Sequence, residues 1–517
     1  MPSRCLTVLP VCLFGSASIG MCAPNPSQWV PARWDGGPLE LARRAKDKTL
    51  SAEAREAIAK WYQPATLDLL NGTPINALLI TFSIGASSEA EAKQQQLAGK
   101  YARMARERGV AVLGVVYPGA DSLAVARGAV ESRLDGLVLD GEFPAGFAAK
   151  VESALRARNS SVPVVPIWRD TASARAAHLS LLAVEGVRPS ARNLSDMGIR
   201  AGPSAEPWIE SNIWLVKSLR GGPEWRPIWI NQQPNSGLLG DYVRCVADAA
   251  VAGGRWIVAP DDDLRSRLFR REAGALGTWR NIATHLKFAE DHAGWRSFLP
   301  YGNVGIIVDA ASQDPEVSNE YLNLVARRQV PYRLIARSAL SQELLASFQA
   351  VLAPDLAAPT GTERLLLSDF ADKGGLVVAG PWWGDVGKDV ATVEPFAEIR
   401  IGKGRAVVYK DNPPEPEAVS KDLVELLEPD VLGLSVFNVP SVISYVSTRE
   451  KQALIQVLNY ATLPSNRVTI RFNGNFNAAR FYTPECAPIN LPVHAAGNNR
   501  TELLIPQLAT WGAVLLE

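Results

Sequence analysis

Short apolar runs alternate with amphipathic helical patterns through the first half of the chain. Runs that predict buried parallel strands lie at residues 30–34, 77–82, 110–117, 136–140, 162–168, 179–184, 227–231 and 256–259. Helical patterns fall between them, at residues 89–108, 122–132, 146–158, 207–219 and 240–251. Eight strands alternating with helices predict a (β/α)₈ TIM barrel rather than an open doubly wound sheet. The first strand requires Pro31 to lie at its start, because proline cannot donate to the middle of a sheet.

The pattern changes after a long predicted helix at residues 264–292. Strands at 303–309, 331–334, 350–353 and 375–379, with helices at 320–328 and 362–373, predict a small flavodoxin-like α/β domain. From about residue 430 only β-type runs remain, at 442–446, 453–459, 467–472, 502–505 and 512–516, which predicts a terminal β-sandwich. We therefore expect the barrel over residues 24–297, the α/β domain over 298–425 and the sandwich over 426–517.

The first 23 residues have the pattern of an export signal. Arg4 precedes an apolar segment at residues 6–14 that is too short to span a bilayer, and small residues follow it. We expect residues 1–23 to be removed and the protein to be secreted or periplasmic. A lipoprotein anchored at Cys22 is the alternative, although Met21 is an unusual residue before a lipidated cysteine. No later segment is apolar enough to predict a transmembrane helix.

Composition narrows the classes of partner and cofactor. Lys+Arg and Asp+Glu both total 53 and no basic cluster stands out, which argues against nucleic acid as a partner. Only Cys245 and Cys486 follow the leader, and the four histidines are widely spaced, so neither a disulfide framework nor a metal site is predicted. The 14 Trp and 11 Tyr residues belong mostly to the core, but flat aromatic rings also suit the apolar faces of sugars.

Acidic residues at the ends of predicted strands are the strongest chemical signal. Asp140 and Glu142 flank Gly141 at the end of the fourth strand, and Glu185 follows the sixth. The carboxyl ends of barrel strands form the floor of the active site, so acids there indicate catalysis. A general acid at Glu185 would need a raised pKa, which apolar surroundings can provide. The alternatives are helix capping for Asp140 and a loop ion pair for Glu185.

Other strand-end residues are candidates for binding a substrate. They are Trp34, Asp35, Tyr117, Trp168, Arg169, Asp170, Trp229, Asn231, Gln232 and Asp261. Aromatic rings can stack on sugar rings, while amides and carboxylates can bond to hydroxyl groups. The alternatives are core packing for the rings and, for Asp261, capping of the helix that begins near residue 264.

Three short motifs in the second half give the chain a family resemblance. They are Gly374-Gly-Leu-Val-Val-Ala379, Gly402-Lys-Gly-Arg-Ala-Val-Val-Tyr409 and Leu458-Asn-Tyr460. With the order of the domains, they resemble the family 42 β-galactosidases and related glycoside hydrolases, which combine a TIM barrel, a glutamine-amidotransferase-like domain and a β-sandwich. The resemblance implies a carbohydrate substrate and no cofactor. It leaves open a homo-oligomer formed through the middle domain.

The catalytic positions depart from that family. Its clan uses an Asn-Glu pair after strand four and a Glu after strand seven, whereas here no Asn precedes Glu142 and the seventh strand ends in Asn231 without an acid. A second pattern, typical of several retaining α-glycosidase barrels, has an Asp nucleophile after strand four and the acid/base on a later strand. It predicts a glycoside hydrolase with Asp140 as nucleophile and Glu185 or Glu142 as acid/base. The alternatives are a non-catalytic carbohydrate-binding protein and a structural or assembly protein on the same scaffold.

Overall fold

The computed structural model describes residues 24–177, 179–192, 208–220, 226–234, 238–309, 314–384, 392–393, 395–437, 439 and 441–517. The expected leader, with Cys22, lies outside these residues, so export stays a prediction. Within the described residues, no helix has the length and apolar character needed to cross a membrane.

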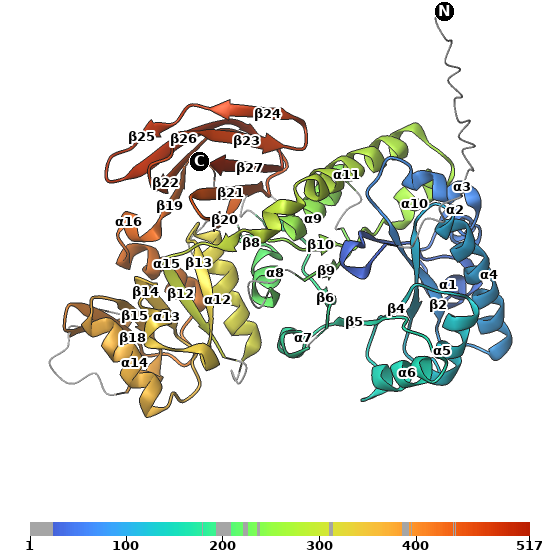
Figure 1. Cartoon of the computed structure of the whole chain (residues 1–517), viewed down its shortest axis with the longest axis horizontal. Coiled ribbons are helices and arrows are strands. Elements are labelled where there is room, and N and C mark those ends of the chain that lie inside the picture. Colours follow the sequence, from blue (N-terminus) through green and yellow to red (C-terminus); the bar gives the residue numbers. More distant parts are fainter. Residues whose placement is uncertain are drawn as a thin grey trace, which may run out of the picture.

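Eight parallel strands form a barrel in the N-terminal half of the chain (Figure 1). In order around the barrel they are β1 (Pro31–Arg33), β2 (Ala77–Ser83), β3 (Ala111–Val116), β4 (Gly136–Leu139), β5 (Val164–Trp168), β6 (Leu182–Glu185), β9 (Ile228–Asn231) and β10 (Arg255–Trp256). The backbone N–H of Arg33 donates to the Val258 carbonyl at 2.7 Å, and the Val258 N–H donates to the Pro31 carbonyl at 3.0 Å. These bonds close the barrel, so the predicted TIM barrel is confirmed. Pro31 begins β1, where the sheet needs no donor.

Alternation along the strands decides which side chains fill the barrel. Val138, Ala183 and Trp229 belong to one buried cluster drawn from strands all around the barrel, which is its interior. Their neighbours Leu139 and Ile230 belong to a different cluster, which includes the surrounding helices. Because successive side chains point to opposite sides of a strand, each strand contributes side chains both to the barrel interior and to the layer that packs against the helices.

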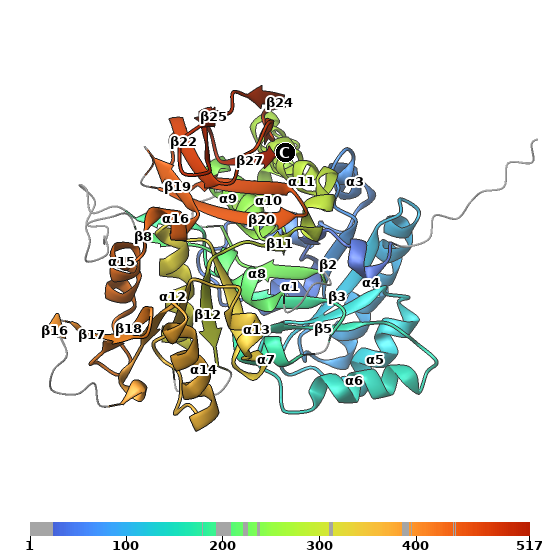
Figure 2. The ribbon, with the colours of Figure 1, turned by 60° about the vertical axis from the view of Figure 1, so that its left-hand side comes forward.

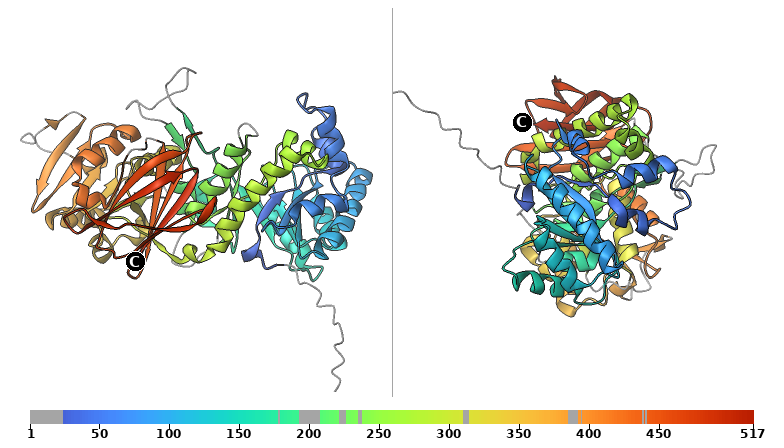
Figure 3. Two further views of the ribbon diagram at one scale, coloured as in Figure 1. Left: turned by 90° about the horizontal axis from the view of Figure 1, so that it is seen from above. Right: turned by 90° about the vertical axis from the view of Figure 1, so that its right-hand side faces the viewer.

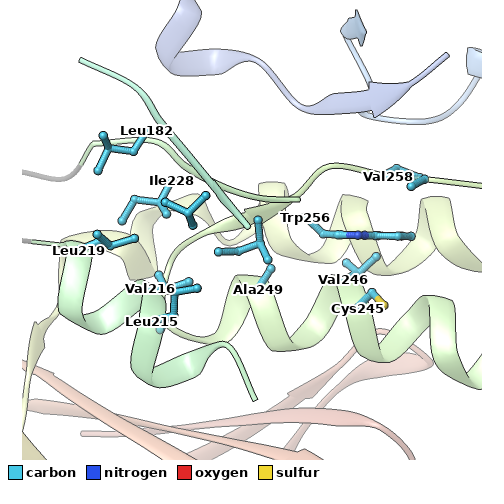
Figure 4. Close-up of a cluster of buried hydrophobic side chains, with 14 of the residues drawn as sticks. Leu182, Leu215, Val216, Leu219, Ile228, Cys245, Val246, Ala249, Trp256 and Val258 are labelled. Atoms are coloured by element: carbon cyan, nitrogen blue, oxygen red, sulfur yellow. The ribbon is translucent and has the colours of Figure 1, made fainter. Parts of the chain in front are cut away.

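Helices cover the outside of the barrel. They are α1 (Gly37–Arg43), α2 (Ala52–Ala59), α3 (Pro64–Leu67), α4 (Ser88–Arg106), α5 (Ser122–Glu131), α6 (Phe147–Arg156), α7 (Thr171–Ala176), α8 (Ile213–Leu219), α9 (Leu239–Val251), α10 (Asp262–Phe269) and α11 (Ala273–Asp291). Figure 4 shows Leu215 and Val216 of α8 and Val246 of α9 packed in one buried cluster with Leu182 of β6 and Ile228 of β9.

Two predicted helices differ from the structure. The segment predicted as one helix at 207–219 begins instead with β8 (Trp208–Glu210), which pairs antiparallel with β7 (Ser190–Arg192) before α8 starts. The helix predicted at 264–292 is divided into α10 and α11. Arg271, between them, has a φ of 59°, and a residue in this left-handed conformation ends a helix.

The second sheet contains seven strands. Their order is β13 (Tyr332–Ala336), β12 (Val304–Val308), β14 (Ala350–Ala353), β15 (Leu376–Ala379), β18 (Gly404–Tyr409), β17 (Phe396–Ile401) and β16 (Thr392–Val393). The first five are parallel, and their chain order, 2-1-3-4-5, is that of flavodoxin-like folds. The helices of this domain are α12 (Pro315–Arg327), α13 (Gln342–Leu345), α14 (Gly361–Asp372) and α15 (Pro416–Leu426). The predicted flavodoxin-like domain is therefore confirmed.

Two antiparallel sheets form the C-terminal sandwich (Figure 2). The larger contains β11 (Leu299–Pro300), β20 (Val442–Arg449), β21 (Gln452–Asn459), β27 (Trp511–Leu516), β23 (Ala479–Thr483) and β24 (Cys486–Leu491). The smaller contains β19 (Leu434–Phe437), β22 (Ser465–Asn473), β26 (Arg500–Leu508) and β25 (His494–Ala495), and the short helix α16 (Pro429–Leu432) precedes it. Val446, Ile455 and Ile470 lie in the apolar core that the two sheets share. The predicted β-sandwich is confirmed.

The barrel lies at one end of the molecule and the other two parts at the other end (Figure 3). Helix α8 contacts α12 of the α/β domain, and α9 contacts β21 of the sandwich. Lys217 of α8 is buried there, with its ammonium 3.4 Å from the ring centre of Tyr332 in the α/β domain and 5.7 Å from that of Tyr445 in the sandwich. Burial lowers the pKa of Lys217 to about 7.

Replacing Lys217 with methionine is expected to stabilise the protein below pH 7. An unfolded lysine keeps its proton up to about pH 10.5, so from about pH 7 to 10.5 the unfolded chain binds a proton that the folded chain has released. The contribution of Lys217 to the free energy of unfolding therefore rises with pH from about pH 7 to 10.5. Allowing for the two cation–π contacts, we expect Lys217→Met to raise the free energy of unfolding at pH 6 by about 2–3 kcal/mol.

Urea unfolding of wild type and Lys217→Met at pH 6 and pH 10 measures this difference. The difference should shrink at pH 10, while the exposed control Lys421→Met should change the free energy of unfolding by less than about 0.5 kcal/mol at either pH. A less stable Lys217→Met variant at pH 6 would show that the cation–π contacts outweigh the cost of burial.

Candidate active site

Polar side chains line the carboxyl end of the barrel. Asp140, for example, comes two residues after the interior residue Val138, so its side chain points the same way. Five residues share this inward position at the ends of different strands: Arg33 on β1, Tyr117 after β3, Asp140 after β4, Glu185 on β6 and Asn231 on β9. The carboxyl ends of parallel strands therefore bring together residues that are distant in sequence.

Arg33 is the centre of this group. Its Nη2 donates to Asp140 Oδ2 at 2.6 Å and to Asn231 Oδ1 at 2.9 Å, while Nη1 donates to the Tyr117 hydroxyl at 3.4 Å. The residue is only 5% exposed, and an arginine this buried is tolerated because its charge is paired. The guanidinium thus fixes the position of the Asp140 carboxylate relative to β1 and β9.

Asn231 extends the contacts to the second acid. Its Nδ2 donates to Glu185 Oε2 at 2.7 Å, while its Oδ1 accepts from Arg33. Both ends of the amide are therefore engaged, which fixes the side-chain orientation. Asp140 and Glu185 are joined by three contacts in series through Arg33 and Asn231, and we call these four residues the mouth cluster.

The pKa of Glu185 is raised above its ordinary value. Burial is the largest cause, and the nearby negative charge of Asp140 adds to it, whereas the bond from Asn231 and the charge of Arg33 oppose it. Glu185 nonetheless keeps exposed surface at the mouth of the barrel. A carboxyl group that holds its proton to higher pH while facing solvent has the property that a general acid requires.

A second group of charged and polar side chains lies beside the mouth cluster, with Asp35 and Glu40 buried. Thr81 Oγ1 is 3.3 Å from Asp35 Oδ1 and 2.9 Å from Glu40 Oε2, and Arg33 Nη1 is 4.0 Å from Asp35 Oδ2. Arg43 pairs with Glu40 through two bonds of 2.6 and 2.9 Å. Burial raises the pKa of Asp35, whereas the Arg43 bonds outweigh burial and hold the pKa of Glu40 below its ordinary value.

Four of these residues were not predicted from the sequence: Arg33, Glu40, Thr81 and Arg43. Arg33 carried a usable signal, because it is a charge within an apolar strand whose inward positions are otherwise packed. The other three lie outside any local pattern. Their role depends on contacts between α1 and β2 that the sequence does not reveal.

Glu142 lies apart from the mouth cluster. Its side chain is 87% exposed, and its carboxylate pairs with Arg169 Nη1 at 3.2 Å. Gly141, with a φ of 127°, turns the backbone between Asp140 and Glu142, so the two acids point in different directions. Of the two predicted partners for Asp140, Glu185 is connected to it through Arg33 and Asn231, whereas Glu142 lies on the surface.

Two of the tryptophans predicted to bind a sugar are packed in the protein core and do not face solvent. Trp34 is fully buried, donates from Nε1 to the Tyr101 hydroxyl at 2.8 Å and packs 5.1 Å from Trp61. Trp229 is fully buried inside the barrel, 6.2 Å from Trp29. Neither ring is accessible to a sugar, because strand alternation turns Trp34 toward the helices and Trp229 toward the interior. Trp168 is half-buried against the outer layer.

Three further residues that were predicted to bind substrate make contacts within the protein instead. Asp170 caps α7 by accepting from the N–H groups of Ala172 and Ser173, and the Ser173 bonds lower its pKa. Asp261 caps α10 by accepting from the Leu264 N–H at 2.7 Å, as expected for a helix cap and not for a sugar-binding residue. Gln232 is buried, and its backbone carbonyl accepts from Trp256 Nε1 at 3.0 Å. Across the described ranges, no group of three or more His, Cys, Asp or Glu residues is arranged to hold a metal ion.

Comparisons with known proteins identify the fold. No family model and no curated protein matches this chain. Among solved structures, α-L-fucosidase isoenzyme 2 from Paenibacillus thiaminolyticus is similar over 94% of this chain and 99% of its own, with a TM-score of 0.60 and 10% identity. The exo-β-1,4-mannosidase Op5Man5 from Opitutaceae bacterium strain TAV5 covers 80% and 99% of the two chains (TM-score 0.48, 11% identity). The family 42 β-galactosidase Gan42B from G. stearothermophilus covers 95% and 98% (TM-score 0.47, 9% identity).

Proposed function

We propose that this chain is an exported glycoside hydrolase that cleaves oligo- or polysaccharides by a retaining, two-carboxylate mechanism. The barrel, residues 24–297, holds the site, with Asp140 as nucleophile and Glu185 as acid/base. The observation that carries the proposal is the mouth cluster, in which Asp140 is paired to a permanent cation and Glu185 has a raised pKa. Two acids in contrasting environments are what this reaction class needs.

Each residue of the cluster has a defined role in this mechanism. Asp140 attacks the anomeric carbon while Glu185 protonates the leaving oxygen, and Glu185 then takes a proton from the water that releases the sugar. Arg33 and Asn231 are positioning residues, since each holds a carboxyl group by a hydrogen bond. Tyr117 lies close enough to the cluster to contact sugar hydroxyls. Asp35 is only 6% exposed, so its role is to support Arg33 and not to contact the sugar. The reaction needs no cofactor.

The comparison with the α-L-fucosidase supports the choice of first substrates. That enzyme shares the fold of this chain over nearly the whole of both chains, so aryl α-L-fucosides come first in a screen. At 10% identity the similarity does not extend to individual residues, and the panel therefore includes other common hexosides.

A carbohydrate-binding protein without catalysis is the second candidate. The observation in its favour is the Arg33–Asp140 ion pair, because an oxygen of the nucleophile is held at 2.6 Å by a buried guanidinium. The absence of an acid at the end of β9, where Asn231 stands, points the same way. Such a protein would bind sugars and leave them intact.

Release of nitrophenol from a panel of p-nitrophenyl glycosides separates the two candidates. The proposal predicts turnover by wild type and its loss in Glu185→Gln, with the exposed acid variant Glu142→Gln as the matched control at wild-type rate. Sugar binding without turnover by wild type would favour the second candidate. If Glu142→Gln lost as much turnover as Glu185→Gln, Glu185 would not be identified as the acid/base, and Glu142 would be a candidate for that role.

The alkaline side of the pH profile should depend on Asn231. The bond from Asn231 to Glu185 favours the ionised carboxylate, so Asn231→Ala is expected to raise the pKa of Glu185 further. Because activity requires protonated Glu185, kcat/KM falls as the pH rises through this pKa, and the falling limb should move to higher pH in the variant. A limb that stays in place or moves to lower pH would assign the titration to another group.

A further inference from the structure

The flavodoxin-like domain has a crevice at the carboxyl edge of its parallel sheet. From β12 the chain passes to β13 on one side and then returns to β14 on the other, so β12 and β14 form the topological switch point. In open α/β sheets, the connections after two such strands separate and leave a crevice where ligands bind.

A cavity of about 410 Å³ occupies this crevice. Asp314 lies on the connection after β12, Asp355 lies two residues after the end of β14, Trp382 follows β15 and Asn412 follows β18. The cavity therefore draws on four strands of the sheet, and its volume is in the range of sites for small molecules. It lies in a different domain from the mouth cluster, and none of its lining residues belongs to the barrel.

Trp382 gives the cavity an aromatic wall. Its Nε1 donates to the Ala353 carbonyl at 2.6 Å, which anchors the indole to the end of β14, and the ring is half-buried. Arg364 lines the same cavity, and its Nη1 donates to the Trp383 carbonyl at 2.7 Å. Asp355 accepts a hydrogen bond from Ser318 of α12. An anchored aromatic ring can stack on the apolar face of a sugar ring, while the neighbouring carboxylates and amide can bond to the sugar's hydroxyl groups.

The charges in the cavity argue against a phosphate or nucleotide ligand. In a flavodoxin-like crevice a phosphate would bind the first N–H groups of the helix after β12. Here Asp314 already accepts from the Glu316 and Val317 N–H groups at 3.1 and 3.2 Å, so a carboxylate occupies that position. With Asp355 also present, Arg364 is the one cationic side chain among the described lining residues.

From these contacts we infer that the α/β domain carries a second binding site, which takes a neutral pyranose unit against Trp382. Asp355 and Asn412 are the residues placed to bond its hydroxyl groups, and Arg364 is placed beside the Trp382 ring, 5.9 Å from its centre. This site is independent of the proposed hydrolysis. It binds sugar whether or not Asp140 is catalytic.

Hydrogen–deuterium exchange of the full chain, with and without L-fucose, D-galactose or D-mannose at saturating concentration, tests the inference. At least one sugar is expected to protect the backbone around residues 353–358 and 380–384. The variant Trp382→Ala should weaken the apparent affinity for this protection by about tenfold, because it removes the stacking surface. Trp383→Ala is the matched control, since this neighbouring tryptophan does not line the cavity and should leave protection unchanged.

Three results would overturn the site. They are no protection of these segments by any of the three sugars, protection that is equally strong in Trp382→Ala, and protection by inorganic phosphate in place of sugar. The test also separates this site from the barrel. Asp140→Asn should keep the protection, and Trp382→Ala should keep any activity toward aryl glycosides, so either proposal can fail alone.

Discussion

Asp140→Asn is expected to lower kcat toward an activated aryl glycoside by about 10⁴-fold, the scale of loss when a covalent nucleophile is removed. Asparagine has nearly the same shape, and its Oδ1 can still accept from Arg33, so the mouth cluster should keep its geometry. What the variant lacks is the negative oxygen that forms the bond to the anomeric carbon. Substrate affinity should therefore change little while turnover collapses, a separation that single-turnover kinetics can measure.

The control for this prediction is Glu142→Gln, two residues away. Glu142 is the more exposed of the two acids and pairs only weakly with Arg169 across the surface, so its neutralisation should leave kcat within about twofold of wild type. If Asp140→Asn kept more than about a tenth of the wild-type rate, Asp140 would not be the nucleophile.

Asp248→Ala is expected to lower the free energy of unfolding by about 3–5 kcal/mol, because it removes a buried acceptor that several donors share. Asp248 of α9 is fully buried and accepts from Ser211 Oγ at 2.8 Å, from both the backbone and side-chain nitrogens of Asn212 at 2.8 and 2.7 Å, and from the Tyr460 hydroxyl at 2.5 Å. Removing it would take the shared acceptor from four buried donors, of which the Ser211 hydroxyl and the Asn212 backbone N–H have no second acceptor among the described residues, while the Tyr460 hydroxyl and Asn212 Nδ2 keep Ser211 Oγ and the Val187 carbonyl. Because Tyr460 belongs to the sandwich, the change would also loosen the contact between sandwich and barrel.

Thermal and urea unfolding of Asp248→Ala measure this cost. The control is Asp291→Ala at the end of α11, an exposed carboxylate paired with Lys287, where we expect less than about 0.5 kcal/mol. Similar losses in the two variants would mean that the buried network contributes no more than a surface ion pair. If the sandwich unfolded before the barrel in this variant, that order would support the role of Tyr460 in holding the sandwich against α9.

Much of the fold followed from the sequence because buried parallel strands are continuous apolar runs. The strands of the barrel start and end within a few residues of their predicted limits, and even the proline-containing β1 is in place. The errors have long-range or backbone causes. Residues 208–210 form a strand because they pair with 190–192, a contact with no local pattern, and α10 is separated from α11 by a left-handed residue that is not glycine.

The candidate site was predictable where strand parity decides orientation. Asp140, Glu185 and Asn231 each follow an interior residue by two positions, so their inward direction is implied by the same alternation that buries Trp229 and turns Trp34 outward. The contact that unites them was not predictable. It depends on Arg33, whose partners are 107 and 198 residues away in sequence.

Asn231 is the polar residue at the end of β9, the seventh strand of the barrel. This strand end has an amide and no acid, and the amide spans the space between Arg33 and Glu185. An amide is suited to this place because it accepts from the guanidinium with one end and donates to the carboxyl group with the other. The acid-free strand is therefore compatible with catalysis by the other two carboxyl groups.

Covalent labelling of the active enzyme shows which residue is the nucleophile. A 2-deoxy-2-fluoro aryl glycoside of the sugar that wild type cleaves forms the glycosyl-enzyme and slows its hydrolysis, so the intermediate can be digested and sequenced by mass spectrometry. We expect one fluoroglycosyl group per chain, attached to Asp140 and absent from Asp140→Asn. A label on any other residue, or an active enzyme that forms no adduct, would contradict it.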